Sequence, residues 1–477
     1  MPGRWSVAGH LVMDDLRALP WSKLASGKGV ALFVLCLAVM SLGWPGELDL
    51  RLWVLVWLWM GSAILWLMLS WMWWELRGER SDAGCFWRAA AVVLAVAVVA
   101  RVLVALGMPT VLSDDIWRYI HDGAVMVEGG NPYALSPDEI AVRDAPVPGV
   151  LAKINNPSLV TIYLPTSQWV FAATGLLAEV LPAWVRESDP SREHLYRLVF
   201  SLFDVGVVVA LLWLLRVIGA SAWWGALYAW HPLVLAEVAG TGHQDPIGVL
   251  LLVLAAVFWV KLLKQVGSGA GSAVGLGVAL AASVLVKPIG FLLVPAVVTT
   301  LWPRWREIAV AAGSAVLAGC VIGLPFVWME GGVERLVETG ERFVEAWSFN
   351  GSVHPLVWWL TGSKAAADAA GGVLLTLVVL LVAWLKVSPV RATAWVVLAG
   401  LLVTSTVHPW YVLWLLPFAV AGRLVSGWVL SLTVLWGYAA HMEPGYRLEA
   451  WIGWAVYVPV YLAVVWDLVW GGRGRDA

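Results

Sequence analysis

Residues 89–107, "AAAVVLAVAVVARVLVALG", decide the class of this chain. At 1.5 Å per residue, a helix over this run crosses most of a bilayer core of about 30 Å. Similar runs recur along the chain, so we predict an all-α, polytopic integral membrane protein with about 13–14 transmembrane helices. The other runs lie near 29–44, 53–73, 197–217, 221–239, 245–264, 271–286, 289–302, 308–327, 369–387, 391–406, 410–422, 425–440 and 450–470.

The composition agrees with a membrane protein. Of the 477 residues, 61% are hydrophobic and 13% are charged, whereas soluble domains carry about 25% charged residues. The 35 tryptophans suit a long perimeter at the membrane–water interface, where lipids are the immediate partners. The net charge of −2 gives no sign of a nucleic-acid partner. Cys36, Cys85 and Cys320 lie far apart without metal-ligand spacing, so we interpret them as packing residues.

Lysine and arginine in the short loops predict the orientation of the helices. Alternating spans place the cations of most helix-flanking loops on one side, which we assign to the cytoplasm; among them are Arg77, Arg216, Lys261, Arg304, Lys386 and Arg423. The protein is therefore expected in the inner (plasma) membrane. The predicted organisation is a cytoplasmic segment at 1–28, three transmembrane helices at 29–107, an outer loop at 108–196, a transmembrane bundle at 197–470 and a cytoplasmic tail at 471–477.

The run 158–181, "LVTIYLPTSQWVFAATGLLAEVLP", conflicts with this alternation because both of its ends must lie outside. Pro165 and the polar residues after it interrupt the run, which favours a re-entrant or interfacial helix. The alternative is one ordinary span, with an error of counting elsewhere.

The unusual polar motifs all fall on the outer side under this topology. Such one-sided chemistry favours an enzyme, whereas a transporter more often carries polar residues near mid-membrane in both halves. The motifs are "SDDIWRYIHDG" (113–123), "AGTGHQDP" (239–246), "VKP" (286–288), "NGSVHP" (350–355), "HPWY" (408–411) and "HMEPGYR" (441–447).

The first motif predicts an interfacial helix that begins at two adjacent carboxylates. Asp115, Arg118 and Asp122 lie at helical spacing, with an apolar stripe opposite, and "GGNPY" (129–133) ends the helix. Asp114 or Asp115 could act as a general base on a hydroxyl group. The alternative is that Ser113 and Asp114 cap the helix.

Other outer residues could contact a phosphate. Lys287 lies at a helix break, where it could meet a lipid-linked phosphate as a point charge or simply snorkel to the interface. His354 and His408 each precede proline, and a histidine could bind phosphate or move a proton, although each alone is more often structural.

A further set could line a sugar pocket. Aromatic rings stack on the C–H faces of sugars, and amides and carboxylates bind hydroxyl groups; the alternative for the rings is an interfacial aromatic belt. His243 and Asp245 resemble a loop dyad, but two ligands without a third are a weak metal signal, so we predict no metal or other cofactor. The sugar- and acceptor-binding candidates are Asp122, Asn131, Tyr163, Gln168, His243, Asp245, His354 and Tyr411, with Trp410 beside them.

Among the charged residues inside the predicted spans, Arg101 and Asp204 need an explanation. Arg101 precedes the outer end of its helix by a few residues, and Asp204 lies at a similar depth in its own helix. A charge in the bilayer needs a partner. We therefore predict a buried, structural ion pair that joins these two helices.

The motif set resembles the GT-C superfamily of polyprenyl-phosphate-sugar-dependent glycosyltransferases, in particular its bacterial mannosyltransferase-like branch (family 87, or domain-of-unknown-function type). The resemblance covers residues 110 to 420, and "YLPTSQ" departs from the Tyr-Pro-Pro and following Gln of relatives. It rests on "DDIWRYIHDG", "GGNPYALSPDE", "INNP", "TIYLPTSQ", "LYAWHPLVLAEVAGTGHQDPIGVLLL", "VKPIGFLLVP", "FNGSVHP" and "HPWYVLWLLP".

The resemblance implies a GT-C-like bundle with outer juxtamembrane helices and a carboxylate base at the membrane edge, here Asp114 or Asp115. The expected reaction transfers a hexose, with mannose favoured, from a polyprenyl-phosphate donor to a lipid or glycan acceptor, with inversion. Lys287, with His408 or Arg118, would meet the donor phosphate. The alternatives are a transporter or flippase of lipid-linked sugars and a non-catalytic subunit of an envelope-assembly complex.

Overall fold

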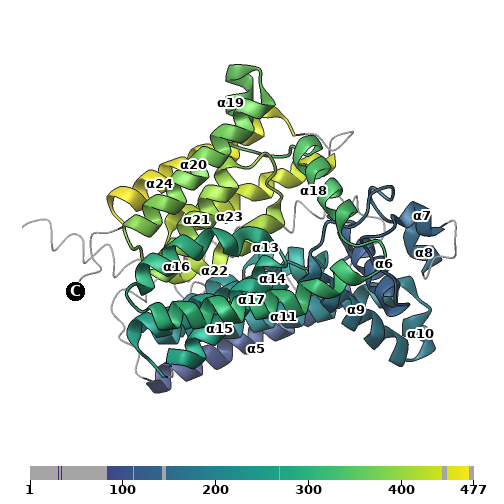
Figure 1. The fold of residues 1–477 in the computed structure, drawn as a ribbon, viewed down its shortest axis with the longest axis horizontal. Coiled ribbons are helices and arrows are strands. Elements are labelled where there is room, and N and C mark those ends of the chain that lie inside the picture. The colour runs from purple at the N-terminus through teal and green to yellow at the C-terminus, as the bar shows by residue number, and fades with distance from the viewer. Residues whose placement is uncertain are drawn as a thin grey trace, which may run out of the picture.

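The computed structural model describes residues 83–110, 112–141, 147–267, 269–442 and 448–471, together with residues 31 and 34. The predicted segment 1–28, the runs 29–44 and 53–73 apart from those two positions, most of the motif 441–447 and the tail beyond Gly471 lie outside the described residues. The described chain folds into helices from α5 to α24, with short 3₁₀ and π segments between them (Figure 1).

Within the part of the chain that the structure describes, six helices are long and apolar enough to cross a membrane, which confirms the prediction of an all-helical, multi-span protein. Each of them would cover the hydrocarbon core at 1.5 Å per residue. They are α5 (Ala83–Gly107), α11 (Asp189–Ile218), α14 (Pro246–Lys264), α17 (Trp305–Trp328), α20 (Lys364–Trp384) and α24 (Ala450–Val469).

Shorter helices pack between the long ones. Several of them begin with proline, whose missing N–H costs nothing in the first helical turn. They are α15 (Gly269–Val284), η3 (Pro288–Leu293) continuing into α16 (Val294–Leu301), α21 (Pro389–Val403), η4 (Pro409–Trp414) before α22 (Leu416–Gly422), and α23 (Val425–Thr433) continuing into η5 (Val434–Met442).

The run 221–239, expected as one ordinary span, is instead broken into short pieces. Nearly every residue from Gly225 to Val249 is buried, so neighbouring helices shield the interrupted backbone from lipid. Pro232 starts one of the pieces, and the last is a π-helix. The pieces are η1 (Ala222–Gly225), α12 (Ala226–Ala229), α13 (Pro232–Val234) and η2 (Leu235–Gly240).

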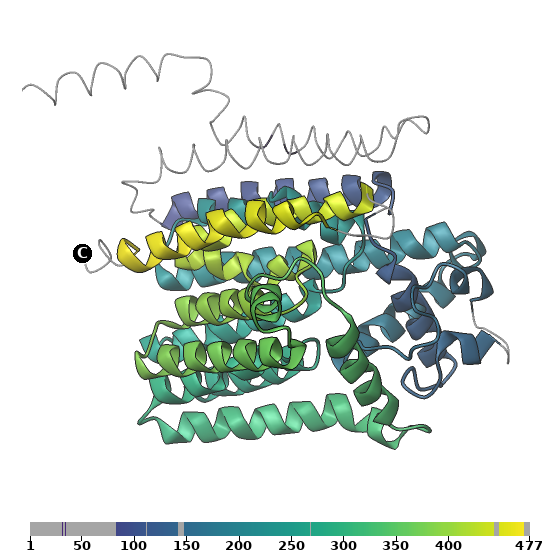
Figure 2. The same cartoon turned by 90° about the horizontal axis from the view of Figure 1, so that it is seen from above.

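The predicted outer loop forms a cap at one end of the bundle. Figures 1 and 2 show its helices beyond the ends of the long helices, with α18 (Glu334–Ala346) beside them and α19 (Val353–Thr361) following in the chain. The run 158–181 is not one helix, because an extended stretch precedes α9, which packs on α6. The cap helices are α6 (Asp115–Val127), α7 (Pro137–Ala141), α8 (Pro148–Leu151), α9 (Pro165–Val180) and α10 (Ala183–Arg186).

The first cap helix, α6, differs from the expected interfacial helix in one respect. Its apolar residues Ile116, Ile120 and Ala124 are buried in the protein, and Arg118 and Asp122 on the other face are buried too, because α9 and the stretch before it cover them. The helix ends at Val127, just before the predicted stop at Gly129.

Basic residues gather at the end of the bundle opposite the cap. Lys264, in the last turn of α14, donates to the carbonyl of Val217 at the end of α11. Arg304, which precedes α17, donates to the carbonyl of Leu262 in the same last turn. Lys264 and Arg304, two of the described cations that flank the predicted spans, therefore lie at the same end of the fold.

The predicted ion pair between Arg101 and Asp204 is confirmed. Arg101 Nη2 lies 2.6 Å from Asp204 Oδ2, and both side chains are buried between α5 and α11. Arg101 also donates to the carbonyls of Ala97 and Ala229, and the Tyr228 hydroxyl donates to Asp204 at 2.5 Å. The pair is thus satisfied by further hydrogen bonds, as a buried charge pair requires.

Replacing Arg101 by Met should destabilise the protein by about 3–5 kcal/mol, because it leaves Asp204 buried without its cation. The measurement is thermal unfolding of the full chain in detergent. The matched control is Arg186→Met, which breaks the exposed pair between Arg186 and Glu187 and should cost less than about 1 kcal/mol. Equal effects of the two substitutions would contradict a structural role for the buried pair.

Candidate functional site

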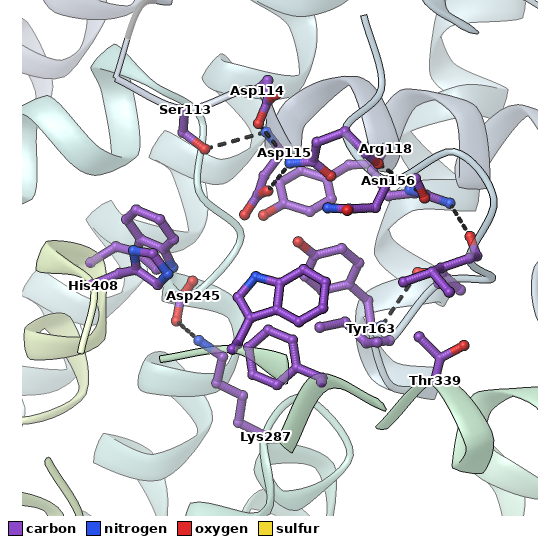
Figure 3. A pocket seen from close by; sticks show the side chains of 18 of the residues that line it. Ser113, Asp114, Asp115, Arg118, Asn156, Tyr163, Asp245, Lys287, Thr339 and His408 are labelled. Carbon is purple, nitrogen blue, oxygen red and sulfur yellow. Dashed lines mark hydrogen bonds and ion pairs between the residues drawn. The ribbon is translucent and has the colours of Figure 1, made fainter. Parts of the chain in front are cut away.

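A cavity of about 550 Å³ lies where the cap meets the end of the bundle (Figure 3). Its wall combines the start of α6, the stretch 155–163, the loop ends before α14, η3 and η4, and one face of α18. The structure thus brings together residues from six separate parts of the sequence. Eight of the predicted site residues line it: Asp114, Asp115, Arg118, Tyr163, Asp245, Lys287, His408 and Tyr411.

The two adjacent carboxylates share one amide donor. Asn155 Nδ2 donates to Asp114 Oδ1 at 2.6 Å and to Asp115 Oδ1 at 3.1 Å. Figure 3 shows Asp115 pointing toward the centre of the cavity and Asp114 at its edge. The loss of bulk water around Asp114, and next the charge of Asp115, raise the pKa of the Asp114 carboxyl above its ordinary 3.8. The pair therefore has one more easily protonated member and one member aimed at the space between the walls.

The capping alternative for these residues is realised by Ser113 and not by Asp114. Ser113 Oγ accepts from the backbone N–H of Asp115 at 3.3 Å. Asp114 occupies the N-cap position, but its side chain makes no capping hydrogen bond. Both carboxylates therefore remain available to the cavity.

The opposite wall carries a cation. Lys287 Nζ donates to Asp245 Oδ1 at 2.5 Å, and Trp414 Nε1 donates to the same oxygen at 2.7 Å. The ammonium also lies 4.4 Å from the ring centre of Tyr411. Both residues line the cavity, but Asp245 is almost fully buried and Lys287 is partly exposed. Asp245 therefore holds the ammonium in place, and Lys287 is the more accessible of the two.

Arg118 lines the cavity, but its guanidinium is largely occupied by the protein. It donates to the carbonyls of Asn155, Asn156 and Leu159 at 2.9–3.0 Å. Asn156 has a positive φ of 47°, a conformation that asparagine tolerates well. Arg118 therefore fastens this turn over α6 and delivers Asn155 to the carboxylates.

Five predicted residues do not line this cavity. Gln168 Nε2 donates to Asp122 Oδ2 at 3.0 Å in a buried network beneath the stretch 157–164. Asn131 Nδ2 donates to two carbonyls just before α18, those of Glu330 and Gly332. These three side chains support the cavity wall from behind.

The other two are histidines in different surroundings. His354 lies 2.9 Å from Asp368 and lines a second, smaller cavity between α20 and α21. His243 is buried behind Asp115, with its ring stacked on Trp410 at 4.0 Å between centroids. Trp410 stacks in turn on His408 at 4.3 Å, and His408 on Phe349 at 4.6 Å.

Several residues of the site were not found by sequence reasoning. Asn155 lies in the "INNP" motif without an assigned role, and Thr339 and Phe343 of α18, with Trp347 just after it, have no local signal. Glu237, buried behind His243, did carry a signal, because it is a lone acid within an apolar run.

Arg197 joins the segments that carry the site. Its guanidinium donates to the carbonyls of Val104 and Met108 at the end of α5, and to that of Ala239 before the His243 loop. The three distances are 2.7–2.9 Å. Arg197 thus holds the chain that leads into Asp114 beside the loop that carries His243.

Within the described residues, no group of three or more His, Cys, Asp or Glu side chains is placed to hold a metal ion. In comparisons with known proteins, no family model and no curated protein matches this chain. The function therefore has to be argued from the geometry.

Replacing Asn155 by Leu should lower stability by about 1 kcal/mol at neutral pH, because two carboxylates lose their shared donor where water partly screens them. Since Asn155 favours the ionised form of Asp114, this loss should shrink as the pH falls through the pKa of Asp114. Thermal unfolding in detergent at neutral and acidic pH measures it. The control is Asn131→Leu, which removes hydrogen bonds to neutral carbonyls and should lower stability equally at neutral and acidic pH. If the two variants depend on pH in the same way, the charge argument is contradicted.

Proposed function

We propose that this multi-pass membrane protein is a glycosyltransferase that moves a hexose, with mannose favoured, from a polyprenyl-phosphate donor to a hydroxyl group of a lipid or glycan. One observation carries the proposal: a carboxylate and an ammonium face each other across one cavity at the end of a bundle of apolar helices. A transfer of this kind needs a base on one side of the anomeric carbon and a cation near the leaving phosphate on the other.

The reaction is a single displacement. Asp115 takes the proton of the acceptor hydroxyl, and the oxygen forms a bond to the anomeric carbon. The bond from that carbon to the phosphate oxygen breaks, and its electron pair leaves with the polyprenyl phosphate, whose charge meets Lys287. Because attack and departure occur on opposite faces, the configuration at the anomeric carbon inverts. One carboxylate suffices, since a phosphate leaves without the acid that glycosidases require.

The remaining residues of the cavity suit a sugar. Tyr163, Trp410 and Tyr411 present ring faces or edges to the cavity, and Asn155 and Thr161 add polar groups. Since Arg118 donates to three backbone carbonyls, Lys287 is the better placed of the two cations for the phosphate. His408 lines the cavity beside Trp410 and is a further candidate for contact with the phosphate.

The distribution of charge supports an outward-facing site in a plasma membrane. Basic residues flank the ends of α11, α14 and α17 that lie away from the cap, and loops rich in Lys and Arg stay in the cytoplasm. The cavity then opens on the extracytoplasmic side, where a lipid-linked donor can reach it from the bilayer.

Asp115→Asn should reduce transfer by about 10²–10⁴-fold, because the amide cannot accept the hydroxyl proton. The assay uses the full chain in detergent with radiolabelled polyprenyl-phosphate mannose as donor and an alkyl mannoside as acceptor probe. Release of free mannose to water is a second readout that needs no acceptor.

Asp138→Asn, on the exposed surface of α7, is the matched control and should retain activity. If wild type neither transfers nor releases mannose but carries the donor across the membrane of a vesicle, the protein is a flippase. Full activity of Asp115→Asn would refute the proposed mechanism.

Lys287→Gln should weaken binding of a sugar-free, short-chain polyprenyl phosphate by about 10–100-fold, the effect of losing one charged hydrogen bond of about 1.5–3 kcal/mol. Lys264→Gln, at the opposite end of α14, removes the same charge where no polyprenyl phosphate is proposed to bind, and it should leave binding unchanged. Binding titrations with the three proteins measure the difference. Equal affinities for wild type and Lys287→Gln would assign the phosphate to another cation.

A further inference from the structure

A buried acid–histidine pair lies directly behind Asp115. His243 Nδ1 is 3.9 Å from Asp115 Oδ2, and His243 Nε2 is 3.3 Å from Glu237 Oε2. His243 and Glu237 are both buried, with 1% and 0% of their side chains exposed, so neither can contact a sugar directly. The imidazole therefore lies between one carboxylate inside the protein and one at the cavity.

The backbone around this pair is unusual in a way that produces the contact. Glu237 lies in the π-helix η2, and the backbone N–H of His243 donates to the carbonyl of Glu237 at 2.9 Å. Gly242 has φ +76°, and a Cβ there would lie 2.5 Å from Ile116 in the first turn of α6. The chain can thus fold back over Glu237 and approach α6 only with glycine at this position. π-Helical turns occur often at functional sites.

Glu237 is held by two further side chains. The Tyr438 hydroxyl donates to Glu237 Oε1, and Thr241 Oγ1 donates to Oε2 at 3.2 Å. A carboxylate fixed in this way, with its second oxygen toward His243, is arranged to stabilise a charged imidazolium. A neutral imidazole could donate to only one carboxylate, whereas both ring nitrogens of His243 face a carboxylate, so the imidazolium fits this site better.

We infer that His243 is a positioning residue: as an imidazolium held by Glu237 and stacked on Trp410, it orients Asp115 and keeps that carboxylate ionised for proton abstraction. This inference rests on the proposed function, in which Asp115 is the base. The proton of the acceptor goes to Asp115, and His243 keeps its own proton throughout. The 3.9 Å separation can close to a hydrogen bond when substrate fills the cavity, since catalytic contacts are often long in unliganded structures.

The charges that face His243 favour its protonated form. Burial alone lowers the pKa of a histidine, but the carboxylates around it, Glu237 foremost, outweigh burial and raise the pKa of His243 above its ordinary 6.5. The facing groups are Asp114 and Asp115 from the start of α6, Glu237 from η2, Asp245 with its partner Lys287, and the Arg197 side chain of α11 packed on Gly242.

The charge state of His243 can be measured without any enzyme assay. The full chain in detergent, with isotope-labelled histidines and the His243 signal assigned by loss in His243→Gln, is titrated by nuclear magnetic resonance. We expect His243 to remain protonated through pH 6.5, the ordinary histidine pKa. Glu237→Gln should shift its titration to lower pH. A neutral His243 at that pH, or a titration that Glu237→Gln leaves in place, would overturn the inference.

The pH dependence of transfer separates positioning from mere packing. His243→Phe keeps a ring on Trp410 but lacks the charge, and His243→Gln keeps polar atoms but lacks both ring and charge. In both, the acid limb of the pH–rate profile should move to higher pH, because Asp115 has lost its cationic neighbour. Each unit of that shift costs about tenfold in rate on the limb. Glu237→Gln, which is nearly isosteric, should move the limb in the same direction.

The results distinguish this inference from the proposed function. If wild type transfers mannose but the acid limb does not move in His243→Phe and Glu237→Gln, the role of His243 is refuted. The transferase proposal is then unaffected. If the protein neither transfers nor releases mannose, the transferase proposal is refuted. The charge pair is still supported in that case if His243 is protonated and its protonation depends on Glu237.

Discussion

The site depends on one guanidinium that lies outside it. Arg197 binds the last carbonyls of α5 and the carbonyl of Ala239, and so fixes the distance between the chain that leads into Asp114 and the loop that carries His243. An arginine buried in an apolar bundle must satisfy its donors, and backbone carbonyls at a helix end need donors in turn. The interaction therefore satisfies both the buried donors of Arg197 and the unpaired carbonyls at the end of α5. The geometry around Asp115 follows from it.

Behind the cavity, the same requirement produces a graded arrangement of charge. Deep in the bundle, Arg101 and Asp204 neutralise each other between two long helices. Nearer the cavity, Glu237 is paired with His243, and Asp245 with Lys287. At the cavity itself, Asp114 and Asp115 share the neutral amide of Asn155, and the imidazole of His243 lies 3.9 Å from Asp115. Charge is fully compensated inside and left partly uncompensated at the surface where a ligand would bind.

The outline of the fold was predictable because its cause is local. A bilayer requires long apolar helices, and the runs at 89–107 and 450–470 have that length and hydropathy. The pair of Arg101 with Asp204 could be predicted because a charge at that depth is costly without a partner. The interruption of 221–239 was not predictable from hydropathy, because Pro232 and a π-helix are tolerated there only through complete burial by other helices.

The sequence alone determined the class of protein, the long apolar helices, and the gathering of polar motifs at one end, since these depend on hydropathy and on the position of charges along the chain. Tertiary structure decided which of those polar residues face the cavity. Asp115 and Lys287 line it, whereas His243 and Gln168 are buried behind it, and α18 contributes Phe343. The reason is physical: a side chain's partners come from elements distant in sequence, and hydrogen-bond geometry and burial, not residue type, settle its role.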